Sequence, residues 1–308
     1  MRLVLKNQKN TSPKIMNKIY SLFITIVCTV NGYAQQPNKL EIPLLKQSQK
    51  VIYHTGYAFS YNELHEQANW VAYQLTASET NSVISRSDKF MIDPAVKTGT
   101  ADNEDYAASG YDRGHLAPAA DMGWSATTMT ESFYYSNMSP QLPAFNRGVW
   151  KRAESLVRTW AATYDSLYIA TGPVLSSGLK SIGHNKVSVP DYYYKVILDN
   201  KKGQRKSIAF IIPNESSKEP LQHFVVSVDK VENMTGIDFF PLLPDDLENK
   251  LENTVNVKAW IWESTSTINR GVNSVQPGNS TQCNGKTKKG TRCKNKTTNQ
   301  SGYCHLHE

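Results

Sequence analysis

Two features are missing from the long central part of this 308-residue chain, residues 35–276. It contains no cysteine, because Cys28 precedes it and Cys283, Cys293 and Cys304 follow it, so disulfides cannot stabilise its core. It shows no internal repeat, which argues against a solenoid. The apolar run that precedes it, at residues 19–30, is too short to cross a bilayer comfortably.

The central part also lacks an excess of positive charge, although the whole chain has a formal net charge of +7. Residues 1–34 carry five basic and no acidic residues, and residues 277–308 carry six basic residues and one acidic residue, so each end contributes +5. Residues 35–276 are therefore left at −3. A broadly basic nucleic-acid-binding surface is excluded there, and any affinity for a polyanion must come from a focused cleft.

The first 34 residues have the layout of a secretory signal peptide. Lysines precede the apolar run at residues 19–30, and the small residues Gly32 and Ala34 suit cleavage before Gln35. This predicts a secreted or periplasmic protein with no stable membrane association after cleavage. An uncleaved membrane anchor is the alternative, and Met16 is an alternative start of the chain.

Composition divides the rest of the chain into four parts: a polar leader at 35–50, one module at 51–262, a linker rich in Ser, Thr, Asn and Gly at 263–281, and a tail at 282–308. Apolar spacing predicts helices at 63–76 and 146–159, although residues 69–73 also suit a strand. Residues 133–138 and three later runs indicate strands, at 166–173, 192–198 and 207–213. Strands and helices without regular βαβ spacing predict an α+β fold.

The first chemistry-bearing motif is Asp112-Arg-Gly-His-Leu-Ala-Pro118. A neutral imidazole at His115 can take a proton from water near neutral pH, and the neighbouring Arg113 can attract a phosphate. A single histidine is more often a surface or core residue, so the interpretation depends on what lies nearby.

The second motif runs from Asn146 to Glu154 at the start of a predicted helix. The ordinary role of Asn146 is an N-cap, and that of Arg158 is a helix salt bridge with Glu154. Eight residues of helix place Asn146 and Glu154 about 80° apart, so both can face one cleft. One amide oxygen and one carboxylate suit Mg²⁺, whereas Zn²⁺ would require more His or Cys. A base, a hard cation and several arginines are what phosphodiester hydrolysis needs.

The sequence resembles the DNA/RNA non-specific endonuclease family, which belongs to the ββα-metal or His-Me finger nucleases and includes endonuclease G. Three segments carry the resemblance: Asp112–Pro118, Phe133–Gln141 and Asn146–Glu154. Shorter matches at 69–73, 171–173, 194–197 and 243–246 extend it over roughly residues 50–255.

This resemblance implies a central antiparallel β-sheet flanked by helices, with an inserted ββα-metal finger. It implies that His115 is the general base, that Asn146 binds Mg²⁺ or Mn²⁺ directly, and that Glu154 binds it through water. Further residues match family positions that contact phosphate or line the site: Arg113, Arg158, Arg86 and Gln141. The implied substrates are DNA and RNA, contacted through the backbone and cut to leave 5′-phosphate ends. A homodimer is compatible with the sequence.

The tail contains Cys283, Cys293, Cys304 and His307, the four ligands that a structural zinc site takes. His305 is an alternative fourth ligand. One disulfide plus a free thiol is the alternative to zinc in an exported protein. Six basic residues lie among these ligands. They suit either non-specific contact with DNA or a protein surface that simply faces solvent.

Two other functions are compatible with these patterns. One is a catalytically inactive nucleic-acid-binding protein, against which the presence of His115, Asn146 and Glu154 argues. The other is an exported toxin or effector nuclease, which a neighbouring immunity gene would indicate.

Overall fold

The computed structural model describes residues 39–44, 50–262, 281–287, 290–297, 301–304 and 307. The predicted signal peptide, most of the predicted linker and His305 lie outside the described residues. Within the described part, no helix combines the length and apolarity that crossing a membrane requires.

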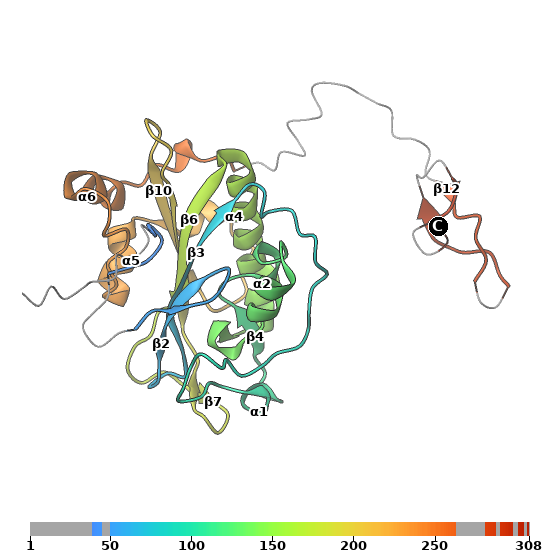
Figure 1. The fold of residues 1–308 in the computed structure, drawn as a ribbon, viewed down its shortest axis with the longest axis horizontal. Coiled ribbons are helices and arrows are strands. Elements are labelled where there is room, and N and C mark those ends of the chain that lie inside the picture. The colour runs from blue at the N-terminus through green and yellow to red at the C-terminus, as the bar shows by residue number, and fades with distance from the viewer. Residues whose placement is uncertain are drawn as a thin grey trace, which may run out of the picture. The chain divides into compact units, whose positions relative to one another are not determined.

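An antiparallel sheet forms the centre of the module, as predicted (Figure 1). In the described residues it has seven strands, in the order β1 (Ile52–Tyr53), β2 (Ala58–Asn62), β3 (Gln67–Thr76), β6 (Ser166–Pro173), β9 (Tyr192–Asp199), β10 (Lys206–Pro213) and β11 (Val225–Val226). Each neighbouring pair is antiparallel. Because β3, β6 and β9 are central and covered on both faces, their residues are buried almost without interruption.

Helices cover both faces of this sheet. The described helices are α1 (Asn103–Tyr106), α2 (Ala126–Glu131), α3 (Pro143–Phe145), α4 (Lys151–Tyr164), α5 (Val228–Thr235) and α6 (Asp245–Asn253). Figure 1 shows α4 on one face and α5 with α6 on the other. Alternate residues of β9 accordingly enter different cores: Tyr193 packs with the α4 residues Val157 and Trp160, and Val196 packs with the α5 residue Val231.

Two predictions of secondary structure were wrong. Residues 67–76 form the strand β3 rather than a helix, as the alternative for residues 69–73 had indicated. A strand buried on both faces has apolar residues at every spacing, including the three- and four-residue spacings of a helix. Residues 135–137 form a 3₁₀ turn, and the strand β5 begins only at Met138.

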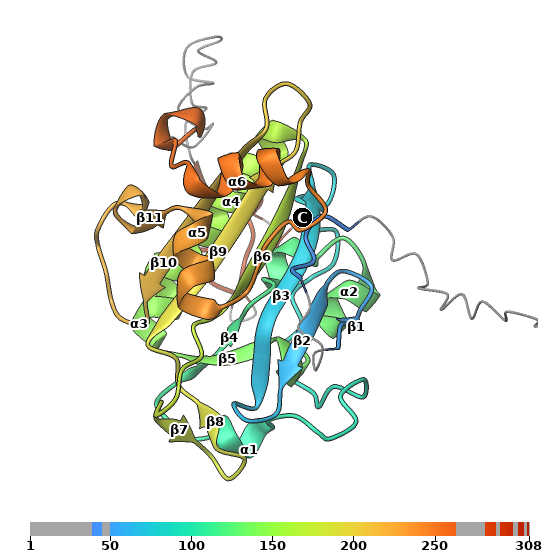
Figure 2. The same ribbon diagram turned by 90° about the vertical axis from the view of Figure 1, so that its left-hand side faces the viewer.

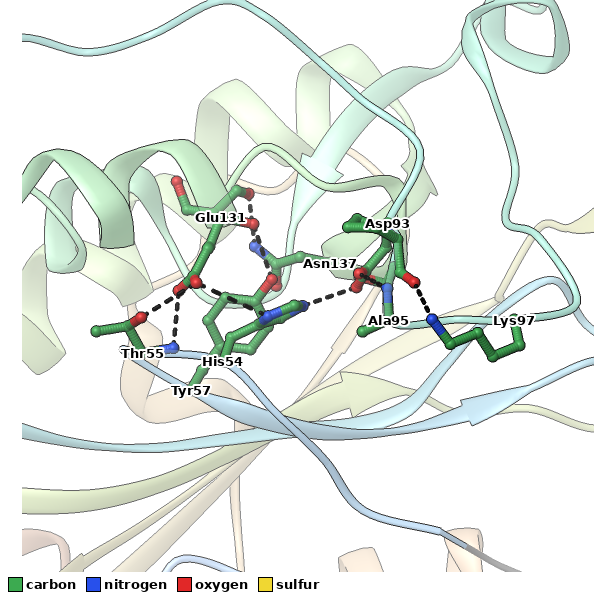
Figure 3. A network of polar contacts seen from close by, with 11 residues as sticks. His54, Thr55, Tyr57, Asp93, Ala95, Lys97, Glu131 and Asn137 are labelled. Carbon is green, nitrogen blue, oxygen red and sulfur yellow. Dashed lines mark hydrogen bonds and ion pairs between the residues drawn. The ribbon is translucent and has the colours of Figure 1, made fainter.

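A buried polar network centred on Asp93 ties the loop that precedes strand β4 to the rest of the module. Strand β4 itself comprises Asp112–His115. His54 lies between two carboxylates, with Nε2 2.7 Å from Asp93 Oδ2 and Nδ1 4.0 Å from Glu131 Oε1 (Figure 3). The Ser136 hydroxyl and the Ala95 amide also donate to Asp93. Burial alone would raise the pKa of Asp93, but these hydrogen bonds lower it below its ordinary value. The ionised carboxylate therefore ties three segments that are distant in sequence.

Candidate active site

A two-stranded hairpin followed by a helix carries the predicted catalytic residues. Strand β4 pairs antiparallel with β5 (Met138–Gln141), so that Asp112 lies opposite Gln141 and His115 lies opposite Met138. The chain then enters α3, the π-helical segment η3 (Asn146–Trp150) and α4. This arrangement is the ββα unit that the resemblance implies.

Asn146 is not an N-cap, so that interpretation was wrong. It has helical dihedrals (φ −55°, ψ −51°), and its backbone N–H already donates a hydrogen bond to the backbone carbonyl of Leu142. The helix start lies earlier because Pro143 suits its first turn. Gly148 (φ −106°, ψ −107°) interrupts the helical backbone between Asn146 and Glu154. Such π-helical segments are frequent at functional sites.

A cleft of about 670 Å³ brings the main candidates together. Six of the predicted residues line it: Arg86, Arg113, His115, Asn146, Glu154 and Arg158. Arg147 and Lys151 add two further basic side chains, and the acidic residues Asp88 and Asp112 also face the cleft. Five basic and three acidic side chains therefore line it, so positive charge is concentrated here within a module of negative net charge.

Gln141 does not line the cleft, contrary to its predicted position. It is fully buried, and neither its Oε1 nor its Nε2 has a hydrogen-bond partner among the described residues. Its side chain packs against the backbone of Gly114, where an added Cβ would overlap it. Gln141 thus supports the strand that carries His115 rather than facing substrate.

This packing makes a prediction about Gly114. We expect Gly114→Ala to displace β4 and lower the nuclease activity that the resemblance implies, because the new methyl group overlaps Gln141 and overpacking costs about 1–3 kcal/mol. The double variant Gly114→Ala/Gln141→Ala should recover stability and activity, since alanine removes the overlapping atoms. Thermal unfolding and plasmid cleavage of both variants and of Gln141→Ala alone check this. Equal loss in the single Gly114 variant and the double variant would contradict it.

His115 lies in a largely apolar setting. Its ring packs edge-on against Phe133 at 4.8 Å between centroids and lies 6.0 Å from Phe90. Its Nε2 is buried without a hydrogen-bond partner in the described structure. Burial, with a smaller effect of the Arg86 charge, lowers the pKa of His115 to about 3. The imidazole is therefore neutral at physiological pH and able to accept a proton.

Two contacts with the helical segment fix β4 in place. Trp150 Nε1 donates to the backbone carbonyl of His115 at 3.3 Å. Asp112 accepts Asn146 Nδ2 at 2.9 Å and a bidentate pair from Arg147 at 2.6 and 2.8 Å. An ionised carboxylate can only accept, so Asp112 orients the amide nitrogen of Asn146 toward itself. The Oδ1 atom of Asn146 is then left for another partner.

Glu154 is half-buried in the lining of the cleft and interacts with the buried charges of Lys195 and Asp121. Burial raises its pKa, and Lys195 on β9 is the strongest of the positive charges that oppose the rise. Burial lowers the pKa of Lys195, which Glu154 opposes in turn. Lys195 Nζ donates to Thr171 Oγ1 at 3.2 Å and lies 4.3 Å from the centre of the Trp150 ring. Arg158 bonds to the buried Asp121 rather than forming the predicted salt bridge with Glu154.

Sequence reasoning missed Lys195 and Asp121. The sequence signal for Lys195 was a charged residue in a strand of buried apolar residues. Lys195 shares one face of β9 with the core residues Tyr193 and Ile197. Asp121 follows His115 by six residues in an otherwise apolar segment, and it also accepts a hydrogen bond from Tyr73. A charged residue within a buried apolar pattern requires a partner, which identifies both positions.

The remaining two arginines are held by aromatic rings at the edge of the cleft. The guanidinium of Arg113 lies 4.7 Å from the centre of Phe90, and its Nη2 donates to Asn103 Oδ1 at 2.8 Å. The guanidinium of Arg86 lies 5.1 Å from the centre of Phe133, and its side chain is 57% exposed. Stacking leaves guanidinium donors available for a phosphate.

The tail brings Cys283, Cys293, Cys304 and His307 into one cluster whose ligand atoms lie within 4.8 Å of one another. The two Sγ atoms of Cys293 and Cys304 are 3.9 Å apart, too far for a disulfide. Tetrahedral zinc with Zn–S bonds of about 2.3 Å requires sulfurs about 3.8 Å apart. His307 directs Nδ1 to two sulfurs at 3.4 Å and Nε2 to the carbonyl of Lys286 at 2.9 Å. The cluster therefore has the ligands and the spacing to hold a metal ion.

Comparison with known proteins identifies the family. The model of the DNA/RNA non-specific endonuclease family matches residues 37–246. The chain is 36% identical to the mitochondrial nuclease EXOG of Danio rerio over 62% of this chain and 61% of that protein. It is 35% identical to the mitochondrial endonuclease G of Bos taurus, over 60% of this chain and 67% of that protein.

A fungal relative and a solved structure agree. Nuclease C1 of Cunninghamella echinulata var. echinulata is 37% identical over 61% of this chain and 81% of its own length. A chain in the crystal structure of the EndoG/EndoGI complex is 32% identical, with a TM-score of 0.61 over 66% of this chain and 89% of that chain. The matched segment contains the whole ββα unit and its cleft. The chain belongs to the DNA/RNA non-specific endonuclease family.

Proposed function

We propose that this protein is a Mg²⁺-dependent endonuclease that hydrolyses phosphodiester bonds of DNA and RNA and leaves 5′-phosphate ends. The observation that carries the proposal is the single cleft in which His115, Asn146 and Glu154 meet five basic side chains. The names of the relatives support nuclease activity.

The residues of the cleft fit a hard cation. Asp112 holds the Asn146 amide so that its oxygen remains for a ligand, and the Glu154 carboxylate lines the same cleft. With so few protein donors, Mg²⁺ would keep most of its waters, and Mn²⁺ has the same preference for oxygen. When bound, the cation would neutralise charge on the phosphate and on the 3′-oxygen that leaves.

The side chains divide the remaining work. His115 accepts a proton from the water that attacks phosphorus, which its low pKa allows because the ring is neutral before the reaction. The bond from phosphorus to the 3′-oxygen breaks, and that oxygen gains a proton from water. Arg113, Arg158 and Lys151 attract the phosphate. These contacts engage only the backbone, so they do not distinguish one base from another.

A digestion assay tests this function. The full-length protein should degrade supercoiled plasmid DNA and a structured RNA in Mg²⁺, lose both activities in EDTA, and regain them with excess Mg²⁺. The DNA fragments should ligate without prior kinase treatment, since their ends carry 5′-phosphates. Cleavage that persists in EDTA would refute the metal requirement. Binding to DNA without cleavage would favour the inactive binding protein.

We further propose that the tail cluster holds one structural Zn²⁺. Metal analysis of the purified full-length chain should find one zinc per molecule, and Cys293→Ser should lose it, because three remaining ligands do not close a tetrahedral site. Nuclease activity on short DNA should be unchanged, since the cleft lies within residues 86–158. Retention of stoichiometric zinc by the variant would contradict this site.

Export is proposed from the basic and apolar N-terminal segment and the cleavage site before Gln35. N-terminal sequencing of the native protein should begin at Gln35. A mature protein that begins at Met1 or Met16 would contradict cleavage.

A further inference from the structure

Five carboxylates gather on the face of the sheet opposite the nuclease cleft. Helix α5 supplies Asp229 and Glu232 at three-residue spacing, and α6 supplies Glu248 and Glu252 at four-residue spacing. Each spacing places its pair on one side of its helix. Asp238 follows the left-handed Gly236 that ends α5. Figure 2 shows the two helices side by side over the sheet.

The carboxylates converge on Glu252. Its oxygens belong to two overlapping groups, one with Asp229 and Glu232 and one with Asp238 and Glu248, and within each group the ligand atoms lie within 4.8 Å of one another. Glu252 is only 6% exposed, and its Oε1 has no hydrogen-bond partner in the described residues. The Oε1 of Glu248 is also buried and without such a partner. A buried carboxylate oxygen directed at other carboxylates is costly unless a cation joins them.

Protein cations do not meet this need in the described part of the chain. None of the five carboxylates forms an ion pair with a described Lys, Arg or His side chain. Burial and the neighbouring acidic residues raise the pKa of Glu248 to about 7 and that of Glu252 to about 8. Protons can thus occupy the cluster when nothing else does, and a divalent cation would displace them.

We propose that Asp229, Glu232, Asp238, Glu248 and Glu252 form a Ca²⁺ site separate from the nuclease centre. All five side chains offer oxygen, which excludes a preference for zinc or copper over hard cations. Carboxylates from two helices and a loop suit the six to eight ligands and variable geometry of Ca²⁺ better than the strict octahedron of Mg²⁺. The bound ion joins α5 to α6.

Calcium-dependent thermal unfolding tests this site. All proteins are full-length and carry Asn146→Ala, which removes the proposed metal ligand of the cleft. After EDTA treatment and dialysis, CaCl₂ at about ten times Kd should raise the Tm of this parent by about 2–4 °C. Adding Glu252→Gln should abolish the shift, because the amide removes the carboxylate that both groups share. Asp246 is an exposed acidic residue on α6 outside the cluster. Adding Asp246→Asn should therefore leave the Ca²⁺-dependent shift in Tm unchanged.

Several results would overturn the proposal. An unchanged parent Tm at 5 mM CaCl₂ would exclude the site, and an equal Ca²⁺ shift in the Glu252→Gln protein would place the ion elsewhere. An equal shift with MgCl₂ at the same concentration would overturn the choice of Ca²⁺. If Glu252→Gln does not fold, Glu248→Gln replaces it with the same expected loss. Calorimetric titration of the parent should show one Ca²⁺ bound, and an absence of binding would also refute the site.

Discussion

Replacing His115 with alanine should reduce DNA and RNA cleavage by about 10²–10⁴-fold, the contribution of a general base. Burial lowers the pKa of His115 to about 3, so the ring is neutral before the reaction, and its Nε2 has no hydrogen-bond partner in the described structure and is free to accept a proton. Initial rates of plasmid nicking at saturating Mg²⁺ measure the effect. The fold should survive, since the His115 side chain makes no hydrogen bond that holds described segments together.

Two comparisons separate loss of a base from loss of structure. His223→Ala changes an exposed histidine outside the cleft and should leave the rate unchanged. Added imidazole should partly restore cleavage by His115→Ala, since the vacated space opens onto the cleft, and a merely structural defect would not respond. Normal activity of His115→Ala would refute its role as base.

Replacing Lys195 with methionine should lower the free energy of unfolding by about 1–3 kcal/mol, because it leaves the half-buried Glu154 carboxylate without its strongest neighbouring positive charge. Methionine keeps the stem of the side chain against Trp150 but removes the charge that most strongly favours ionised Glu154. Urea unfolding at pH 7 measures the change. Lys202→Met, at an exposed lysine, should alter the stability by less than about 0.5 kcal/mol.

A double variant decides whether Glu154 causes this loss. If it does, Lys195→Met/Glu154→Gln should be more stable than Lys195→Met, because the unpaired carboxylate is gone. Additive losses from the two changes would show that Lys195 acts on packing alone.

The sequence could place His115, Asn146 and Glu154 in one cleft because they lie close together in the chain. His115 and Asn146 are joined by one hairpin, and Glu154 follows on the same helical segment, so short motifs carry most of the site. Lys195 comes from a different strand, and only the sheet register that pairs it with Thr171 brings it under the cleft. No local pattern contains that register.

The wrong predictions share a physical cause. Local spacing shows that a residue is buried or polar, but it does not show which neighbour the side chain meets. The apolar residues of β3 suited a helix because both sheet faces bury them. Gln141 was assigned to the site because it matches a family position, but its side chain is buried against Gly114. Asn146 was interpreted as an N-cap because the helix was expected to begin there. The helical segment instead begins at Pro143.

The sheet also separates opposite charges. Basic side chains line the cleft on the α4 face, and five acidic side chains gather on the face covered by α5 and α6 (Figure 1). A module with this distribution of charge carries a permanent dipole from one face of the sheet to the other. In the field of a polyanion it experiences a torque that turns the cleft forward before contact. The module can therefore meet a polyanion with its cleft foremost although its net charge is negative, and added salt should slow that approach.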